Sequence, residues 1–469
     1  MPIMLKKNKN NISSLNKLSI LMIQKVPEFG NKFFYSLGFL SMISFMLLLL
    51  TGIMMIIFGP NWWLINPVGV FFRSIHLWST QAFVLFIILH LFVVFSTSGF
   101  KKPRTLVWIL GVIMFVFVMA ETEFGYVLRG DYSSQWRSLQ GADFYNGSYL
   151  GKLIDTLNYK QMYGFHIVII PVIIGLILLV HYSLVRLLGL SNPKRANKNI
   201  AKTVPANHGL LFKRGGILII AIVALAIIFP SPFIKPVTIK EIAISDPFLL
   251  GKTLTAELNS SSDTATYMDS INPYTFSTKN IYIDNPYKTL LTINPQIKNQ
   301  LTVFNNLPED TKTSQISQLE KYYDNSSNLT APKTPTHDLI NSLVQMAATG
   351  LYEQNIANSN DTFATGNHTT YVLRFLADTG VLEEKATTLN LTTDQYGMLH
   401  EESSKNPVGA WWLAPIGLAV HTIFKNDSNG DRDTAVLIGL FILLLIAFPY
   451  IPYVNKIPEK LKMYKLFQR

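Results

Sequence analysis

The stretch GFHIVIIPVIIGLILLVHYSLVRLLGLSNP, residues 164–193, decides the fold of this chain. Its apolar run from Phe165 to Leu190 is longer than the roughly 20 residues that a helix needs to cross a bilayer. Two histidines, His166 and His181, stand inside this run, where ionisable side chains are costly and usually functional. The segment therefore predicts a transmembrane helix that carries a site.

Five further stretches have the same apolar character, so the chain is expected to cross a membrane six times. The composition agrees, because 49% of the 469 residues are hydrophobic and the mean hydropathy is +0.26. The predicted fold class is an all-α polytopic membrane protein with a four-helix bundle, two further transmembrane helices and a large extracytoplasmic mixed α/β insert. The predicted spans are residues 34–58, 75–98, 106–128, 165–190, 215–233 and 434–453.

The net charge of +11 is unevenly distributed along the chain. Residues 235–406 hold 19 acidic and 12 basic side chains, so this region carries −7 and the remainder carries +18. The basic residues gather at both ends of the chain, at residues 101–104 and at residues 186–214, which fall on one side of a six-span topology. The positive-inside rule makes that side cytoplasmic. The charge therefore records topology, and a basic face for nucleic acid is not indicated.

This topology divides the chain into eight parts. They are a cytoplasmic amphipathic segment (1–33), a four-helix core (34–191), a cytoplasmic linker (192–214), a fifth span (215–233), an extracytoplasmic insert (234–406), an amphipathic segment (407–425), a sixth span (434–455) and a basic tail (456–469). Within the insert, residues 336–351 predict a helix and residues 369–375 a strand. Three histidines of the insert show no ligand-like spacing and are interpreted as surface or packing residues: His337, His368 and His400.

The predicted outer segments also contain eight Asn-X-Ser/Thr sequons, which mark surface loops if the cell attaches glycans. An Asn-rich composition produces such triplets by chance as well, and both interpretations stay open. The sequons begin at Asn146, Asn259, Asn325, Asn328, Asn360, Asn367, Asn390 and Asn426.

Four of the nine histidines lie inside predicted spans: His76 and His90 in the second, His166 and His181 in the fourth. At about 100° per residue, steps of 14 and 15 residues return to one helix face, with about 21–22 Å between the two levels. Both helices run inward, so each level receives one imidazole from each helix. Paired imidazoles fit haem iron, whereas zinc or copper would recruit further ligands. A lone membrane histidine is often a packing residue, but two matched pairs favour a site.

Glycines repeat the histidine spacing on two other helices. Gly38 and Gly52 are 14 residues apart in the first span, and Gly111 and Gly125 are 14 apart in the third. A glycine lets a large flat group approach a helix backbone closely, although a single membrane glycine usually serves helix packing. In this register the glycines favour two macrocycles at two depths.

Residues 34–193 resemble the cytochrome b/b6 family of quinol-oxidising complexes. The matching text includes YSLGF…LLLLTG, RSIH…LH, GVIM…GYVL and GFHIVIIP…HYSLVRLLGLSNP. The 15-residue step in the fourth span, Pro171 and the Arg186-x-x-Gly189 tail are closer to the b6 branch than to mitochondrial cytochrome b. The resemblance therefore implies a four-helix di-haem core.

By this resemblance, His76 and His166 hold an outer, lower-potential haem b without a covalent link, and His90 and His181 hold an inner, higher-potential one. Arg73 matches a family arginine that pairs with a haem propionate, and the alternative is an interfacial anchor.

The resemblance also implies an inner quinone site near Arg186 and His208. Lys213 and Arg214 lie in the same region and fit ordinary positive-inside residues better.

Three departures from the family pattern limit what transfers. Ser36 replaces the cysteine of b6 proteins, which excludes their covalently attached third haem. The outer quinol motif GYVLPWGQ reads GYVLRGDY from residue 125, which keeps Tyr126 but loses the Pro-Trp pair. The PEWY motif has its best match at residues 407–412, PVGAWW, where alignment on Trp411 places Ala410 at the glutamate position.

The family's PEWY glutamate takes a proton from quinol, so its loss needs a substitute. Glu123, with Glu121 as second choice, lies at the outer end of the third span, where family members are usually apolar. A carboxylate facing lipid there would cost roughly 2.5–3.5 kcal/mol, whereas in a partly dry quinone pocket it is suited to accept a proton. The alternative is a salt bridge to Arg129 or Arg137.

The sequence thus predicts the di-haem cytochrome b subunit of a respiratory quinol oxidoreductase. Because the chain has no cysteine, it can bind neither an iron–sulfur cluster nor a covalent haem. A Rieske protein, a c-type or copper carrier, quinone and a homodimeric partner are implied by the resemblance. The alternative is a transmembrane haem conduit that does not bifurcate electrons, and a non-redox membrane anchor is disfavoured by the paired ligands.

Overall fold

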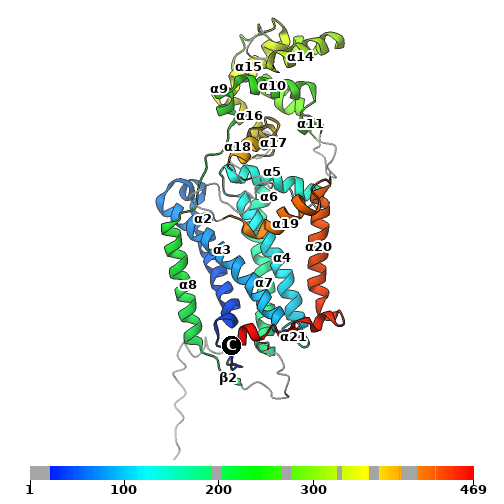
Figure 1. The fold of residues 1–469 in the computed structure, drawn as a ribbon. Coiled ribbons are helices and arrows are strands. Elements are labelled where there is room, and N and C mark those ends of the chain that lie inside the picture. Colours follow the sequence, from blue (N-terminus) through cyan, green and yellow to red (C-terminus); the bar gives the residue numbers. More distant parts are fainter. Residues whose placement is uncertain are drawn as a thin grey trace, which may run out of the picture. The chain divides into compact units, whose positions relative to one another are not determined.

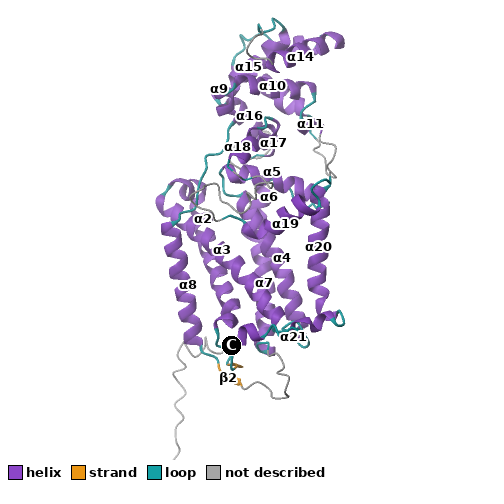
Figure 2. Ribbon diagram, viewed as in Figure 1, coloured by secondary structure: helices purple, strands orange, loops and turns teal. Residues whose placement is uncertain are grey.

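The computed structural model describes residues 22–191, 203–266, 276–324, 330–358, 369–389, 391, 409–427 and 429–468. Nearly all elements in these ranges are helices (Figure 2), and their one sheet pairs β1 (Lys25–Pro27) with β2 (Thr203–Pro205) in antiparallel fashion. The chain forms two compact units. The first comprises Met1–Ala120, Ile170–Ser231 and Leu440–Arg469, and the second Glu121–Ile169 and Pro232–Gly439. The predicted core, 34–191, is therefore shared between both units.

Among the described residues, six helical segments are long and apolar enough to cross a membrane, which confirms the predicted spans. They expose many large apolar side chains, such as Leu187 at 80% and Ile220 at 70%, which suits contact with lipid. The chain is therefore a multi-pass membrane protein. The spanning elements are α2 (Leu37–Ile65), α3 (Pro67–Ser96), α4 (Thr105–Val127), α6 (Tyr159–Gly164) with a π-helical turn (Phe165–Ile169) and α7 (Ile170–Leu188), α8 (His208–Ile228) and α20 (Gly430–Ala447).

The connection between the first two spans is shorter than the predicted span bounds, 34–58 and 75–98, imply. α2 continues past a kink at Gly59, whose φ of 75° favours a residue without Cβ, and Pro60 follows it. Asn66 then separates the two helices. Its side chain caps α3 by accepting a hydrogen bond from the backbone N–H of Val68 at 2.9 Å. This cap fixes the start of the helix that carries His76 and His90.

In the first unit, α2, α3 and α8 lie side by side (Figure 1). Ile75 of α3 packs against Ile222 and Ala226 of α8 in a small buried cluster. The end of α7 is held by Arg104, whose guanidinium donates hydrogen bonds to three backbone carbonyls at residues 188–190. These contacts satisfy carbonyls that a helix end leaves without intrahelical partners.

The insert is helical throughout the residues described, so the predicted mixed α/β fold is wrong for them. The helix predicted at 336–351 is confirmed as α15, but the strand predicted at 369–375 is α17. The apolar residues of α17 bury one helical face, with Val372 and Phe375 fully buried, and this packing overrides the local strand preference. The helices are α9 (Ile239–Ser245), α10 (Pro247–Asn259), α11 (Asp263–Thr266), α12 (Asn285–Ile293), α13 (Gln300–Asn305), α14 (Glu309–Asp324), α15 (Pro335–Thr349), α16 (Leu351–Asn358), α17 (Thr370–Asp378) and α18 (Val381–Thr388).

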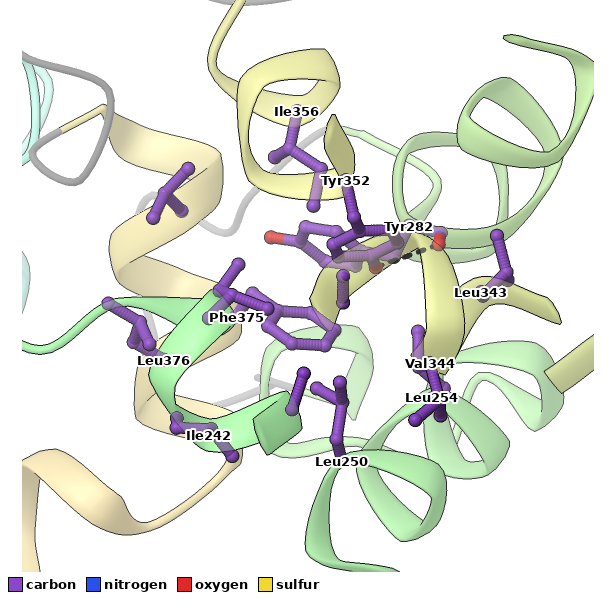
Figure 3. Packing of buried hydrophobic residues seen from close by; sticks show 14 of the residues in the cluster. Ile242, Leu250, Leu254, Tyr282, Leu343, Val344, Tyr352, Ile356, Phe375 and Leu376 are labelled. Atoms are coloured by element: carbon purple, nitrogen blue, oxygen red, sulfur yellow. Dashed lines mark hydrogen bonds between the residues drawn. The ribbon is translucent and has the colours of Figure 1, made fainter. Parts of the chain in front are cut away.

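The core of the insert is built around aromatic residues (Figure 3). Tyr282 and Tyr352 pack their rings 5.1 Å and 5.6 Å from the ring of Phe375, and the Tyr352 hydroxyl donates to the backbone carbonyl of Tyr282 at 2.9 Å. Leucine and isoleucine side chains from α9, α10 and α15 surround this group. Burial of so much apolar surface makes the insert a folded body.

A helix not predicted from the sequence, α5 (Tyr132–Gly147), shares this core. Asp131 and Ser134 form a capping box at its start. Tyr132 is fully buried and donates from its hydroxyl to the carbonyl of Leu382 at 2.6 Å. The remaining short helices are α19 (Ala414–Leu418), α21 (Ile457–Lys460) and α22 (Lys465–Gln468).

Candidate functional site

The two histidines predicted to hold the inner haem, His90 and His181, both lie within the first unit. A Cβ added to Gly38 would lie 3.2 Å from Cε1 of His90, and one added to Gly111 would lie 3.4 Å from Cε1 of His181. The imidazoles of His90 and His181 also interact electrostatically with each other. Each imidazole thus lies beside a glycine of another helix, where the backbone carries no side chain that would fill the space.

His76, which is predicted to hold the outer haem, also lies in the first unit. A Cβ on Gly52 would lie 3.7 Å from its Cε1. The hydroxyl of Thr51 donates to the carbonyl of Leu47 at 2.7 Å and lies 2.8 Å from Nδ1 of His76. Because the hydroxyl proton is used, the oxygen accepts from Nδ1–H, which leaves the lone pair on Nε2, the nitrogen that can ligate iron.

His166 belongs to the second unit and has a different partner. Its Nδ1 lies 3.0 Å from the carboxylate Oε1 of Glu121 and 3.1 Å from the backbone carbonyl of the same residue. A backbone carbonyl can only accept, so Nδ1–H is the donor and Nε2 again carries the lone pair. A Cβ on Gly125 would lie 2.8 Å from Cε1 of His166, closer than real Cβ atoms approach.

These four glycine–histidine contacts fit the haem that the sequence predicts. Each predicted haem glycine adjoins one predicted ligand, so the glycines and the histidines are in register. Within the described ranges, no group of three or more His, Cys, Asp or Glu side chains could hold a bare metal ion. A pair of imidazoles beside backbone without side chains suits a flat macrocycle better than a compact ion.

Arg73 is buried, with 7% of its surface exposed, and it donates from Nη2 to the carbonyl of Ser231 at 2.9 Å. The backbone N–H of Ser231 in turn donates to the hydroxyl of Ser74 at 2.8 Å. Arg73 therefore has the burial expected of a partner for a buried anion, one helical turn before His76.

The outer quinol candidates gather in the second unit. Tyr126 is buried, its ring lies 6.3 Å from that of Trp412, and the guanidinium of Arg137 lies 4.1 Å above it. Glu123 is half-buried and interacts electrostatically with Arg137. Trp411 packs its ring 5.7 Å from that of Trp412. The structure thus brings together the altered GYVL motif and the PEWY-like segment.

Ala410 of the PEWY-like segment is fully buried. Arg129, one of the two arginines considered as partners of Glu123, instead forms a buried salt bridge of 2.9 Å with Asp131.

Some predicted features lie outside the described ranges. They are residues 407 and 408, His368, His400 and the sequons at residues 325, 328, 360, 367 and 390.

The inner quinone candidates lie at helix ends in the first unit. His208 begins α8 and donates from Nε2 to the carbonyl of Ile23 at 2.9 Å. Arg186 is exposed on the last turn of α7. Lys213 is exposed as well, and Arg214 lies 5.8 Å above the ring of Phe33. Their role toward quinone stays a prediction.

Sequence reasoning did not predict the hydrogen-bond partners of Nδ1 on the two histidines expected to hold the outer haem, Thr51 for His76 and Glu121 for His166. Thr51 could have been found because it directly precedes Gly52, a residue already assigned to the site. Glu121 lies four residues before Gly125 and so shares its helix face, which predicts a side chain directed at the same ligand. Arg137 lies on α5, and nothing in the apolar pattern predicted that helix.

Known proteins match part of the chain. The family model described as cytochrome b(N-terminal)/b6/petB matches residues 81–241. Cytochrome b6 of Heliobacterium modesticaldum is 30% identical over 190 residues, which cover 36% of this chain and 89% of that protein. Cytochrome b6 of Rippkaea orientalis is 31% identical over 193 residues, which cover 36% of this chain and 85% of that protein.

A solved chain of a hyperthermophilic respiratory complex III is 16% identical with a TM-score of 0.38, and the match covers 76% of this chain and 94% of that one. The identity to the b6 proteins, across most of their length, is sufficient by itself to assign the family. This chain belongs to the cytochrome b/b6 family.

Proposed function

We propose that the chain is the di-haem cytochrome b subunit of a quinol-oxidising membrane complex. Family membership implies a non-covalent haem b and a role in electron transfer. The observation that carries the proposal is the set of four glycine–histidine contacts, one for each expected ligand. His76 and His166 would hold the outer haem through Nε2, and His90 and His181 the inner one. When bound, haem iron supplies one-electron transfer between the two sides of the membrane.

At the outer end, the residues of the second unit support a quinol site. Tyr126 and Trp411 would supply its aromatic walls, and Glu123 would accept a proton from quinol in place of the missing PEWY glutamate. Arg137, stacked on Tyr126, would hold the Glu123 carboxylate in place. Glu121 is the weaker candidate for this role, because its carboxylate is bonded to His166. Arg186 and His208 remain the candidates for the inner quinone.

The proposal requires partners. The chain has no cysteine, so the high-potential acceptor would belong to a Rieske protein and the next carrier would be a c-type cytochrome or a copper protein. A homodimer within this complex is part of the proposal. The Lys/Arg distribution supports cytoplasmic termini and an extracytoplasmic insert. The sequons of the insert either carry glycans or arise by chance from its Asn-rich composition, and both interpretations stay open.

The direct test is the pigment content of the purified complex. We expect b-type bands in the reduced-minus-oxidised spectrum and two haems b per chain, both extractable by acidic acetone. His90→Ala should lose the inner haem and retain the outer one, because the two ligand pairs lie about 21–22 Å apart along their helices. A spectrum without b-type bands contradicts the proposal, and loss of both haems from His90→Ala contradicts the assignment of separate ligand pairs.

A second function, a haem conduit without bifurcation, is favoured by one observation: a buried alanine occupies the position of the PEWY glutamate. Quinol added to the oxidised complex distinguishes the two functions. Bifurcation predicts transient reduction of the haems that depends on the Rieske partner and is blocked by an outer-site quinol analogue. Haem reduction that needs no Rieske partner and resists the analogue supports the conduit.

A further inference from the structure

The contact between Glu121 and His166 has a chemical meaning beyond ligand placement. We propose that Glu121 is a positioning residue that sets the redox potential of the outer haem by accepting the Nδ1–H of its ligand His166. This inference rests on the proposed function, since it requires His166 to ligate iron. The carboxylate Oε1 lies 3.0 Å from Nδ1, a charge-assisted hydrogen bond inside a spanning segment.

The bond acts on the iron through the imidazole ring. A carboxylate that accepts the Nδ1–H of a ligand histidine fixes the ring orientation and makes Nε2 a stronger electron donor. A stronger donor stabilises the ferric form relative to the ferrous form, so the potential falls. Only 17% of the Glu121 side chain and 21% of the His166 side chain are exposed, so water screens this bond weakly.

The ring of His166 has little freedom to leave this bond. The backbone carbonyl of Glu121 accepts from the same Nδ1 at 3.1 Å. Gly125, on the facing helix, is in close contact with the imidazole ring of His166. Phe124 and Phe165, the neighbours of Gly125 and His166, pack 5.6 Å apart and hold the two helices together at this level.

The other outer ligand provides the internal contrast. Nδ1 of His76 is bonded to the neutral hydroxyl of Thr51 at 2.8 Å, not to a carboxylate. The two ligands expected on one haem therefore differ in the charge of their partners. The anionic partner is the one expected to lower the potential, and the hydroxyl serves mainly to fix the tautomer.

Glu123 provides the matched control. It lies two residues after Glu121, about 200° around the helix, and interacts with Arg137 instead of with a ligand. Glu121→Gln and Glu123→Gln remove the same charge at nearly the same depth. Only the first removes an anionic partner from the ligand imidazole.

The test is a potentiometric titration of the intact complex, monitored in the b-type bands. We expect Glu121→Gln to raise the midpoint potential of the outer haem by at least about 59 mV, which for one electron is a tenfold change in the ferric-to-ferrous equilibrium. The midpoint potential of the inner haem should stay unchanged. Glu123→Gln should shift the outer potential by less than half as much, as should Thr51→Val. An unchanged outer potential in Glu121→Gln overturns the inference. An equal shift in Glu123→Gln also overturns it, because the potential would then respond to any nearby negative charge and not to the hydrogen bond with His166.

A second readout uses the unmodified complex, in case Glu121→Gln does not retain the outer haem. The infrared difference spectrum between redox states should contain a carboxylate stretching band that titrates with the outer haem. Absence of such a band overturns the inference. If the purified complex contains no haem b at all, the proposed function fails instead, so the two failures are distinguishable.

Discussion

Replacement of Glu123 by glutamine is expected to lower quinol oxidation by about 10²–10⁴-fold while both haem spectra stay intact. The amide has the size of the carboxyl group and can still contact Arg137, but it cannot accept a proton at neutral pH. Glu123 is half-buried and interacts with Arg137, whose guanidinium lies 4.1 Å above the Tyr126 ring. The measurement is the steady-state reduction of the electron acceptor by quinol in the purified complex.

The conservative control is Glu123→Asp, which retains a proton acceptor and should keep a measurable rate. Its pH–rate profile should differ from that of the parent complex, since the acceptor group has changed. Turnover of Glu123→Gln at the parent rate would show that another group takes the proton.

The second large effect concerns the stability of the insert, which should fall as the pH rises. Burial, and then the neighbouring Asp378, raise the pKa of Glu257 from its ordinary value of 4.5 to about 9. The pKa of Asp378 is raised by burial as well, although Arg374 opposes this shift. Glu257 is fully buried and accepts a hydrogen bond from Ser262 at 2.8 Å. Between about pH 4.5 and 9, Glu257 therefore keeps its proton in the folded insert but loses it in the unfolded chain.

The sign follows from this difference in bound protons. Below about pH 4.5 both states are protonated, so the stabilisation is complete; between about pH 4.5 and 9 it is lost progressively, by at most about 1.4 kcal/mol per pH unit. Hydrogen–deuterium exchange on α10 and α17 in the whole protein, corrected for intrinsic amide exchange, measures this loss. Glu257→Gln should flatten the pH profile, whereas Glu383→Gln, at an exposed position of α18, should not. A profile in Glu257→Gln as steep as in the parent protein would contradict the assignment.

The spans and the register between the glycines and the histidines could be predicted because their signals are local, and the assignment of the histidines as haem ligands stays a prediction. Apolar length defines a spanning helix, and the helical period fixes which face holds His76 and His90. The same period relates Gly38 to Gly52, and the structure bears out the register by setting each glycine beside one histidine.

The remaining features depend on contacts between distant residues, which a local pattern does not contain. Thr369–Phe375 has strand-like composition, yet it forms part of a helix because its apolar face packs into the insert core. α5 has no apolar stripe, since its buried residues include Ser134, Gln135 and Arg137, whose polar atoms find partners in the fold. The helical period places Glu121 on the face of Gly125, whereas its contact with His166 depends on the pairing of two helices.

The shared core of α5 and the insert bears on attempts to shorten this protein to the length of its b6 relatives. Tyr132, Leu139 and Ala142 of α5 are buried in the same cluster as the insert helices. Gln135 exchanges two hydrogen bonds with the backbone of Val237, at 2.8 and 2.9 Å. Excision of residues 237–391 would therefore expose an apolar surface of α5 and leave the Gln135 amide without the carbonyl and the N–H that it bonds. A minimal version of this subunit would need a redesigned α5, because α5 and the insert helices share one hydrophobic core.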